Sequence, residues 1–361
     1  MDTEMPAPDA PPAIWALTPG GSRLALKLAR LYPGARVFLG QGAGPVEDNA
    51  TPLPIQRFTR LSRELAIRFR AFPAHIFIFS TGIALRVLAP LMENKQEDPA
   101  VVLLDEGGQN VISLLSGHIG GANALTRELA EKIKANPVIT TATDVNDLPA
   151  IDTLAVSLGL VIENRQAIKA VNLGILQGKR VQLIDTTGEL AAGLPGVDLE
   201  IIHDSKGFSP KESIPKVFCS WRDTAVPRGT LILRPRCLTL GMGCNRNTSL
   251  AELREFAQTT LAHHGISRAS ITTLATTTVK ADESGLLALA EAWNLPMTFY
   301  DKSHLNSVDT IETPSEMVEK HLGVKSVCEA AAILAANHGR LILPKQKNPN
   351  VTLAVAWATS M

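Results

Sequence analysis

The 361-residue sequence has only four cysteines, and no two of them are spaced as a paired motif. They are Cys219, Cys237, Cys244 and Cys328. Scattered thiols are typical of proteins from a reducing compartment. We therefore expect a cytoplasmic protein that has neither a disulfide framework nor a structural zinc site.

The chain also lacks net charge and long apolar runs. Thirty-five basic residues balance 35 acidic ones, so no global field attracts nucleic acid or a membrane, and local clusters must hold any anionic ligand. Apolar runs are strand-length and interrupted, so we expect no membrane span. Residues 1–13 lack the basic start and apolar core of a secretory signal, and we expect a disordered tail there.

Several familiar motifs are absent as well. The sequence has no Walker loop, no HExxH and no GxSxG. Gly241-Met242-Gly243 begins like a dinucleotide-binding loop, but Arg246 stands where a glycine is needed. The eight histidines show no metal-ligand spacing. We therefore expect no bound cofactor and no protein-bound metal.

What the chain does contain is an alternation of strands and helices. In the first part, the expected strands are 14–17, 35–39, 75–79, 101–104, 111–115 and 137–141. Helices are expected between them, as at 22–31, 61–69 and 80–92. This alternation predicts a largely parallel sheet covered by helices, in which ligands bind beyond the carboxyl ends of the strands. Ser80-Thr81-Gly82 and Asp105-Glu106 fall at such ends.

The remaining chain predicts a multi-domain α/β protein. An N-terminal α/β domain covers 14–143. A less regular region rich in proline and glycine, 144–229, is predicted to be a small middle domain or a linker between two larger lobes. A C-terminal α/β domain covers 230–361, again with a mainly parallel sheet. Three capping boxes predict helix starts in this last domain: Ser249 with Glu252, Thr313 with Glu316, and Ser326 with Glu329.

Residues 105–129 predict a first candidate site, in a strand–turn–strand–loop–helix unit. Its glycines allow close approach of the backbone to a ligand, and free N–H groups at a helix start favour an anion. Glycines alone would favour a tight strand-to-helix connection without a ligand. Because His118 lies in the bend and Asp105-Glu106 at a strand end, we expect a site.

A second candidate lies around Arg246, between a strand and a capped helix. Backbone donors and a guanidinium there suit a carboxylate or a phosphate. The alternative is a surface arginine that covers the helix start. Lys280 is likewise open to interpretation as a functional lysine or part of a solvated face.

Six stretches make the sequence recognisable. FIFSTGIALRVLAPL, DPAVVLLDEGGQNVISLLSGHIGGANALTRELA and PVITTATDVN resemble the N-terminal half of the cobalt-precorrin-5A hydrolase family, CbiG, of anaerobic cobalamin biosynthesis. GMGCNRNTS, VKADESGLLALAEAWNLPMTFYD and TPSEMVEKHLGVKSVCEAAAIL resemble its C-terminal domain. One departure is Asn247, where we expect the family to have glycine; asparagine tolerates left-handed dihedral angles better than most residues.

The resemblance implies a substrate and a reaction. The substrate is a cobalt-containing macrocycle with acetate and propionate arms, one of which is closed as a δ-lactone onto the methylated meso carbon. Hydrolysis opens the lactone, and the meso carbon leaves with its methyl group as acetaldehyde. Cobalt arrives within the substrate, and transient handover to other enzymes of the pathway is implied. A non-catalytic tetrapyrrole carrier, or a nucleotide- or phosphate-binding α/β protein, are the alternatives.

On this basis we assign roles as hypotheses. His118 is the general base for water, and Glu106 or Asp105 orients it or moves protons. Backbone N–H groups of the glycine bend hold the oxyanion or the lactone carboxyl group. Arg246 binds a peripheral carboxylate. The expected substrate-binding residues are Ser80, Thr81, Gly82, Ser116, Gly117, Gly120, Gly121, Asn123, Gly243, Cys244, Arg246 and Lys280.

Overall fold

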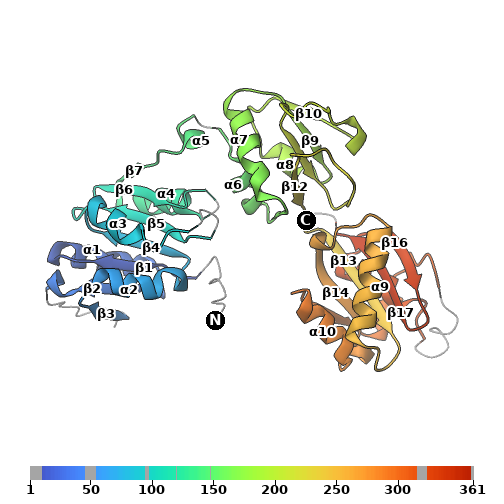
Figure 1. Cartoon of the computed structure of the whole chain (residues 1–361). Coiled ribbons are helices and arrows are strands. Elements are labelled where there is room, and N and C mark those ends of the chain that lie inside the picture. Colours follow the sequence, from blue (N-terminus) through green and yellow to red (C-terminus); the bar gives the residue numbers. More distant parts are fainter. Residues whose placement is uncertain are drawn as a thin grey trace. The chain divides into compact units, whose positions relative to one another are not determined.

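The structure, a computed structural model, describes residues 10–44, 54–93, 97–118, 120–146, 148–314 and 323–358. The chain forms two compact units, residues 1–153 and 154–361. The first unit contains one sheet and the second contains two (Figure 1). Most neighbouring strands are parallel in the first two sheets, and the last sheet has two parallel and two antiparallel pairs. The expected multi-domain α/β fold is confirmed. No helix in the described part of the chain is both long and apolar enough to cross a membrane.

The sheet of the first unit has seven strands in the order β3-β2-β1-β4-β5-β6-β7. Their bounds are β1 Ala13–Ala16, β2 Arg36–Gly40, β3 Ile55–Phe58, β4 Ala74–Ile78, β5 Ala100–Leu104, β6 Asn110–Leu115 and β7 Asn136–Val138. Strands β1 to β5 are all parallel to one another. The order of the strands reverses between β1 and β4, which makes this the point where an open α/β sheet usually binds a ligand.

Helices cover both faces of this sheet. The helices are α1 Pro19–Leu31, α2 Leu61–Arg68, α3 Thr81–Leu88 and α4 Ala122–Ile133, followed by the short α5 Ala142–Val145. Helices α1 and α4 pack on one face and α2 and α3 on the other. Because both faces are covered, the central strands are continuous apolar runs, and all five residues of β5 are buried.

One histidine belongs to this core and has a structural role. His75 is fully buried, and its Nδ1 accepts a hydrogen bond of 3.0 Å from the Trp15 indole. Burial lowers the pKa of His75 to about 4, so the ring is neutral.

The hairpin of β5 and β6 gives the sheet two chemically different edges. Strand β6 runs antiparallel to β5, with Leu104 opposite Val111 and Val101 opposite Leu115. Strand β7 is parallel to β6. The carboxyl ends of β1 to β5 therefore lie at one edge, here called the cavity edge. Strands β6 and β7 run toward the opposite edge, here called the His118 edge. At ~3.3 Å per residue, the length of β5 separates the two edges by roughly 15 Å.

The second unit begins with a five-stranded sheet in the order β10-β9-β11-β12-β8. Its strands are β8 Val161–Ile162, β9 Val181–Asp185, β10 Leu199–Ile201, β11 Lys216–Cys219 and β12 Leu231–Arg234. Its helices are α7 Ile168–Leu176 and α8 Glu189–Ala192, and α6 Ile151–Ser157 precedes them. Only β8 is antiparallel to its neighbour, at the edge of the sheet.

The last sheet has the order β15-β14-β13-β17-β16. Its strands are β13 Leu238–Cys244, β14 Ile271–Thr277, β15 Met297–Tyr300, β16 Arg340–Lys347 and β17 Val351–Trp357. Helices α9 Leu250–His263 and α10 Ser284–Ala292 pack on one face. Helices α11 Lys302–Asn306 and α13 Val327–Ala335 pack on the other.

The three expected capping boxes have three different outcomes. Ser249 caps α9 by accepting a bond of 3.2 Å from the N–H of Glu252, as expected. Ser326 makes no such bond, so the box at α13 is wrong. Glu329 is instead buried and accepts from backbone N–H groups, among them that of Lys345 at 2.8 Å. The box of Thr313 with Glu316 extends outside the described residues.

A further correction concerns the glycines before Arg246, which we expected in a loop. Strand β13 continues through Cys244, so Gly241 and Gly243 lie inside the sheet. A Cβ atom on Gly241 would lie 1.9 Å from the carbonyl oxygen of Cys328. Gly241 is therefore needed because α13 packs closely on β13. The residue that requires a glycine here, Cys328, lies far away in the sequence.

Candidate functional site

A cavity of about 610 Å³ opens at the cavity edge of the first unit. It is lined by Leu17, Thr18, Ile78, Phe79, Ser80, Thr81, Ile83, Leu103, Asp105, Glu106, Asn110, Ile112 and Val138. Residues that follow β1, β4 and β5 all contribute, so the cavity lies where the strand order reverses. Its size is that of sites for small molecules.

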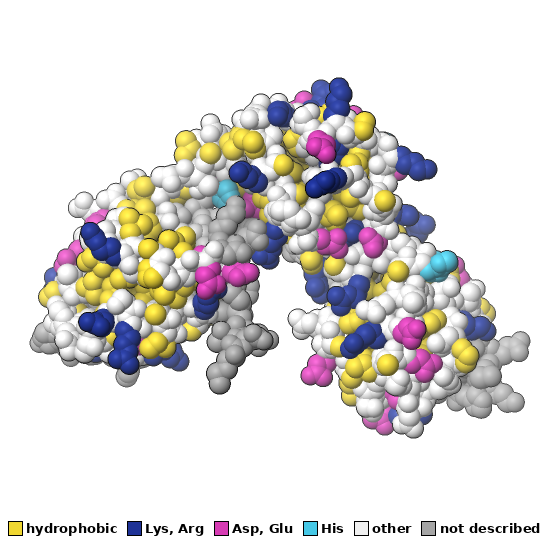
Figure 2. All heavy atoms as spheres, in the orientation of Figure 1, with side chains coloured by type: hydrophobic (Ala, Val, Ile, Leu, Met, Phe, Trp, Pro, Cys, Tyr) yellow, Lys and Arg dark blue, Asp and Glu magenta, His cyan; other side chains and the backbone are white. Residues whose placement is uncertain are grey.

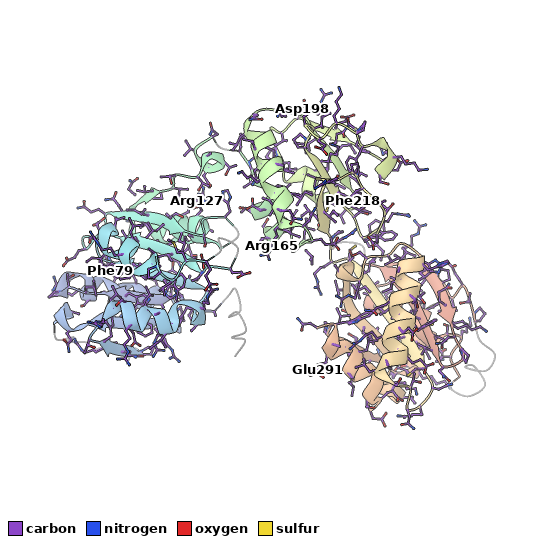
Figure 3. The ribbon with its side chains drawn as sticks, viewed as in Figure 1. Phe79, Arg127, Arg165, Asp198, Phe218 and Glu291 are labelled. Carbon is purple, nitrogen blue, oxygen red and sulfur yellow. The ribbon has the colours of Figure 1, made fainter. Side chains whose placement is uncertain are left out.

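The cavity brings together two of the predicted motifs. Ser80 and Thr81 line it beside Asp105 and Glu106. Gly82 does not line it, and its carbonyl accepts a bond of 2.9 Å from Arg86. The wall is mostly apolar. Phe79, labelled in Figure 3, directly follows β4 and stacks on Phe77, with 4.8 Å between ring centroids.

Helices α2 and α3 carry an apolar surface of three exposed side chains. Ile67 on α2, and Ile83 and Leu85 on α3, are exposed by 67%, 38% and 52%. Hydrophobic side chains gather on this part of the first unit in Figure 2. Ile83 belongs both to this surface and to the cavity lining.

The two adjacent carboxylates of the cavity differ in their surroundings. Asp105 accepts hydrogen bonds from the N–H groups of Gln109 at 3.2 Å and Asn110 at 2.6 Å, and so holds the β5–β6 turn. Burial opposes the ionisation of Asp105, but these donors outweigh it and lower its pKa. Glu106 has no hydrogen-bond or ion-pair partner among the described residues.

The carboxylate of Glu106 rests on a glycine at the start of α1. A Cβ atom on Gly20 would lie 1.8 Å from Oε1 of Glu106. Any larger residue at this position would force the carboxylate to move. Gly20 thus leaves room for Glu106 beside the cavity.

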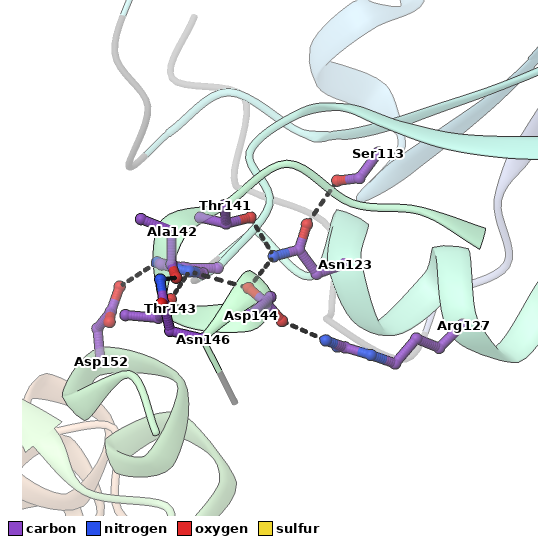
Figure 4. A network of polar contacts seen from close by, with 10 residues as sticks. Ser113, Asn123, Arg127, Thr141, Ala142, Thr143, Asp144, Asn146 and Asp152 are labelled. Atoms are coloured by element: carbon purple, nitrogen blue, oxygen red, sulfur yellow. Dashed lines mark hydrogen bonds and ion pairs between the residues drawn. The ribbon is translucent and has the colours of Figure 1, made fainter. Parts of the chain in front are cut away.

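His118 lies at the other edge of the sheet and contacts Thr143, Asp144 and Asp152, which are labelled in Figure 4. Its Nε2 is 3.1 Å from Oγ1 of Thr143 and 3.5 Å from Oδ2 of Asp144. Its Nδ1 is 3.5 Å from Oδ2 of Asp152. The contact with Asp152 raises the pKa of His118; burial opposes this, and the charge of Asp144 adds to it.

Asn123 connects this histidine network to the sheet. Its amide donates to Thr141 at 2.8 Å and to Asp144 at 2.9 Å, and its oxygen accepts from Ser113 at 2.6 Å. Arg127 on α4 forms an ion pair with Asp144 (Figure 4). Asn123, predicted to bind substrate, is 5% exposed and positions Asp144.

The glycine bend around His118 serves mainly to close this turn. A Cβ atom on Gly117 would lie 2.6 Å from Oδ1 of Asn123, and one on Gly120 would lie 2.4 Å from Cβ of Ser116. Gly121 has a φ of +86° and donates its N–H to the carbonyl of His118 at 2.9 Å. That N–H is therefore not available to an oxyanion, contrary to our expectation.

The expected pairing of His118 with Asp105 or Glu106 is wrong. Because β5 and β6 are antiparallel, the residues before and after the hairpin lie at opposite edges of the sheet. The acidic partners of His118 are Asp144, which follows β7, and Asp152, at the start of α6. Reasoning from the sequence missed both. The parallel pair β6–β7 was the available clue, since it puts residues after 141 beside His118.

In the second unit, Arg246 and Lys280 meet through acidic neighbours. Arg246 Nη1 is 2.5 Å from Asp282, and Lys280 Nζ is 3.1 Å from Glu283. Glu283 also accepts from the N–H of Asn247 at 2.8 Å. Asn247 has a φ of +61°, so asparagine takes the left-handed conformation for which we expected glycine.

Two other predicted binding residues are part of β13. Gly243 and Cys244 pair with Thr352 and Val351 on β17. Burial raises the pKa of the Cys244 thiol, although Lys280 opposes the shift, so the thiol is neutral. Within the described ranges, no group of three or more histidine, cysteine, aspartate and glutamate residues is arranged to hold a metal ion.

Family descriptions match most of the chain. Three family descriptions match in succession: "Cobalamin synthesis G N-terminal" at 64–144, "Cobalamin biosynthesis central region" at 149–235 and "Cobalamin synthesis G C-terminus" at 238–356. A solved structure of a cobalamin biosynthesis protein G homologue from Sulfolobus solfataricus is 21% identical, with a TM-score of 0.35, covering 96% of this chain and 97% of that one.

Two relatives carry the name cobalt-precorrin-5A hydrolase. The one from Priestia megaterium is 33% identical over 95% of this chain and 94% of its own length. The one from Salmonella typhimurium strain LT2 is 35% identical over 96% of this chain and 97% of its own length. The chain belongs to the cobalt-precorrin-5A hydrolase family.

Proposed function

We propose that this protein is a cobalt-precorrin-5A hydrolase. It opens the δ-lactone of the cobalt-containing macrocycle and releases acetaldehyde, which gives cobalt-precorrin-5B in cobalamin biosynthesis. The observation that carries the proposal is the similarity, over at least 95% of the chain, to two relatives of that name. The four cysteines are free in the structure, which suits the cytoplasmic location that we propose.

The reaction makes limited demands on the protein. Opening the lactone requires water, a proton acceptor and stabilisation of a tetrahedral oxyanion. In the carbon–carbon cleavage that follows, the metallated macrocycle can accept the electron pair, so this chemistry belongs to the substrate. The protein must supply proton transfer, positioning and recognition of carboxylate arms.

Arg246 and Lys280 are the residues that we propose for the carboxylate arms. The side chain of Arg246 is 52% exposed, so an arm of the substrate can replace or join Asp282 as its partner. Glu283, 2% exposed, holds Lys280 in place. Transient handover of the product to other enzymes of the pathway is part of this proposal.

His118 is the base that the sequence suggests. Its present hydrogen-bond partners must change before it can act on water. Both ring nitrogens contact polar groups, and the two aspartates favour the protonated ring. His118 can activate water only after Nε2 has exchanged Thr143 for water. If His118 is the base, His118→Ala lowers turnover far more than affinity, and unchanged acetaldehyde release from this variant contradicts the role.

The proposed function is tested with purified protein and the lactone intermediate. Acetaldehyde is trapped and counted while the macrocycle is weighed by mass spectrometry. We expect one acetaldehyde per macrocycle and the matching loss of mass. A carrier protein would instead give tight binding and a spectral shift without acetaldehyde.

A further inference from the structure

We infer that the cavity at the cavity edge receives the lactone of the macrocycle, and that Glu106 is the base that activates water there. This inference rests on the proposed function and assigns a location and a residue to its first step. Three features of the cavity carry it: the charge of its lining, the free carboxylate of Glu106, and the glycine on which that carboxylate rests.

The lining discriminates between the arms of the substrate. It includes the carboxyl groups of Asp105 and Glu106 but no lysine, arginine or histidine. Ionised acetate and propionate arms are repelled by these carboxylates. The lactone is the arm that carries no charge, because its carboxyl group is esterified. Its ring carbons and the methyl group fit the apolar wall formed by residues such as Phe79 and Ile83.

The size of the cavity also fits a part of the macrocycle. A volume of about 610 Å³ accommodates a small-molecule group rather than a macrocycle with all of its arms. Ile83 of α3 belongs both to the cavity lining and to the apolar surface on α2 and α3. An edge of the ring that carries the lactone can therefore enter while the adjoining apolar ring surface lies over α3.

Of the two carboxylates in the cavity, Glu106 is the one available for chemistry. The oxygens of Asp105 are occupied by the N–H groups of Gln109 and Asn110 and by the Asn110 side chain. Both oxygens of Glu106 are without a donor among the described residues. A carboxylate in this state can accept a proton from a water molecule.

The chemical step balances with water as the co-reactant. Glu106 takes one proton from water as the water oxygen bonds to the lactone carbonyl carbon. The tetrahedral intermediate then collapses, the bond from this carbon to the ring oxygen breaks, and Glu106 returns the proton to that leaving oxygen. The products are a carboxyl group on the arm and a hydroxyl group on the meso carbon, with Glu106 restored.

The same charge pattern favours release of the product. Ring opening turns the neutral arm into a carboxylate, which then faces Asp105 and Glu106. Like charges at close range repel each other. We therefore expect the opened product to bind more weakly than the lactone, and the difference to shrink when Glu106 is neutralised.

The first test is Glu106→Gln, with Glu131→Gln as the matched control. Glu131 is an exposed residue of α4 outside the cavity lining. We expect Glu106→Gln to lower kcat by about 10²- to 10⁴-fold with little change in KM, since proton transfer makes a contribution of this size. Glu131→Gln should behave like the wild type. In Glu106→Ala, added formate should restore part of the lost rate, because it replaces the missing carboxylate. If Glu106 had only a structural role, formate would not restore the rate.

The second test moves the carboxylate without removing it. Alanine is well tolerated in the first turn of a helix, so Gly20→Ala should fold, and its Cβ atom displaces Glu106. We expect a lower kcat, an unchanged thermal unfolding temperature and a smaller loss than in Glu106→Gln. Full kcat in Gly20→Ala would overturn the placement of the base.

The outcomes separate this inference from the proposed function. If the wild-type protein releases no acetaldehyde from the lactone, the proposed function fails. If the wild type releases acetaldehyde and folded Glu106→Gln releases it at the same rate, the function stands and the inference is overturned. Several-fold tighter binding of the opened product to Glu106→Gln than to the wild type supports the inference, and equal binding contradicts its charge argument.

Discussion

The two edges of the N-terminal sheet use polar residues in opposite ways. At the His118 edge, polar groups pair with one another: Asn123, Asp144 and Arg127 form a continuous network with His118. At the cavity edge, Asp105 is paired but Glu106 is left beside an apolar hollow.

This difference separates residues that hold the fold from residues that a substrate can use. A polar network whose members satisfy one another stabilises a particular arrangement, and each member is costly to remove. A carboxylate without a partner contributes little to stability and keeps its capacity to accept a proton. The following predictions compare paired residues with residues that a substrate can reach.

The largest effect on stability is expected at the His118 edge. Asn123→Ala removes one partner from Ser113, Thr141 and Asp144 and should lower the free energy of unfolding by about 1–3 kcal/mol. Urea unfolding measures this change. Glu106→Gln is the control from the other edge and should unfold at the wild-type urea concentration. Equal losses of unfolding free energy in Asn123→Ala and Glu106→Gln would contradict the difference between the two edges.

A smaller effect is expected on binding in the second unit. Arg246 is paired with Asp282 but exposed. It therefore shares pairing with the residues of the His118 edge and accessibility with Glu106. Arg246→Ala should raise KM by about tenfold and leave kcat unchanged, because it removes a charge-assisted contact made equally before and during reaction. Steady-state kinetics with the lactone substrate measures both constants. An unchanged KM would show that Arg246 does not bind the substrate.

The smallest effect is the pH dependence of stability at His118. Its pKa in the folded protein is raised above the ordinary 6.5, chiefly by Asp152. A raised pKa gives stability that is fully present below 6.5 and is lost as the pH rises through the folded value. The difference in unfolding free energy between wild type and His118→Gln should therefore be largest in mildly acidic buffer and shrink at alkaline pH. A difference that grows with pH would contradict the ion pairs.

The sequence predicted the cavity edge well because its determinants are local. Ser80, Thr81 and Glu106 each directly follow or closely follow a strand, and carboxyl ends of parallel strands meet at one edge. The hairpin of β5 and β6 is also predicted from the sequence. Because β6 returns antiparallel to β5, it carries the chain to the other edge, so His118 lies away from Glu106.

The roles of three other residues could not be predicted from the sequence, because they depend on contacts between distant segments. Asp152 meets His118 from the start of another helix, and no local pattern links the two residues. The sequence suggests that Gly241 is a loop glycine, but a glycine is needed there because the carbonyl of Cys328 on α13 lies too close for a side chain. Glu329 reads as a capping residue and instead holds the backbone of Lys345.

The most direct measurement is the single-turnover rate of acetaldehyde release from the lactone substrate by Glu106→Gln and His118→Gln, side by side at saturating enzyme. The assignment of water activation to the cavity edge predicts that Glu106→Gln is slowed by at least about a hundredfold and is much slower than His118→Gln. A rate near that of the wild type in folded Glu106→Gln, with the large loss in His118→Gln, would contradict it.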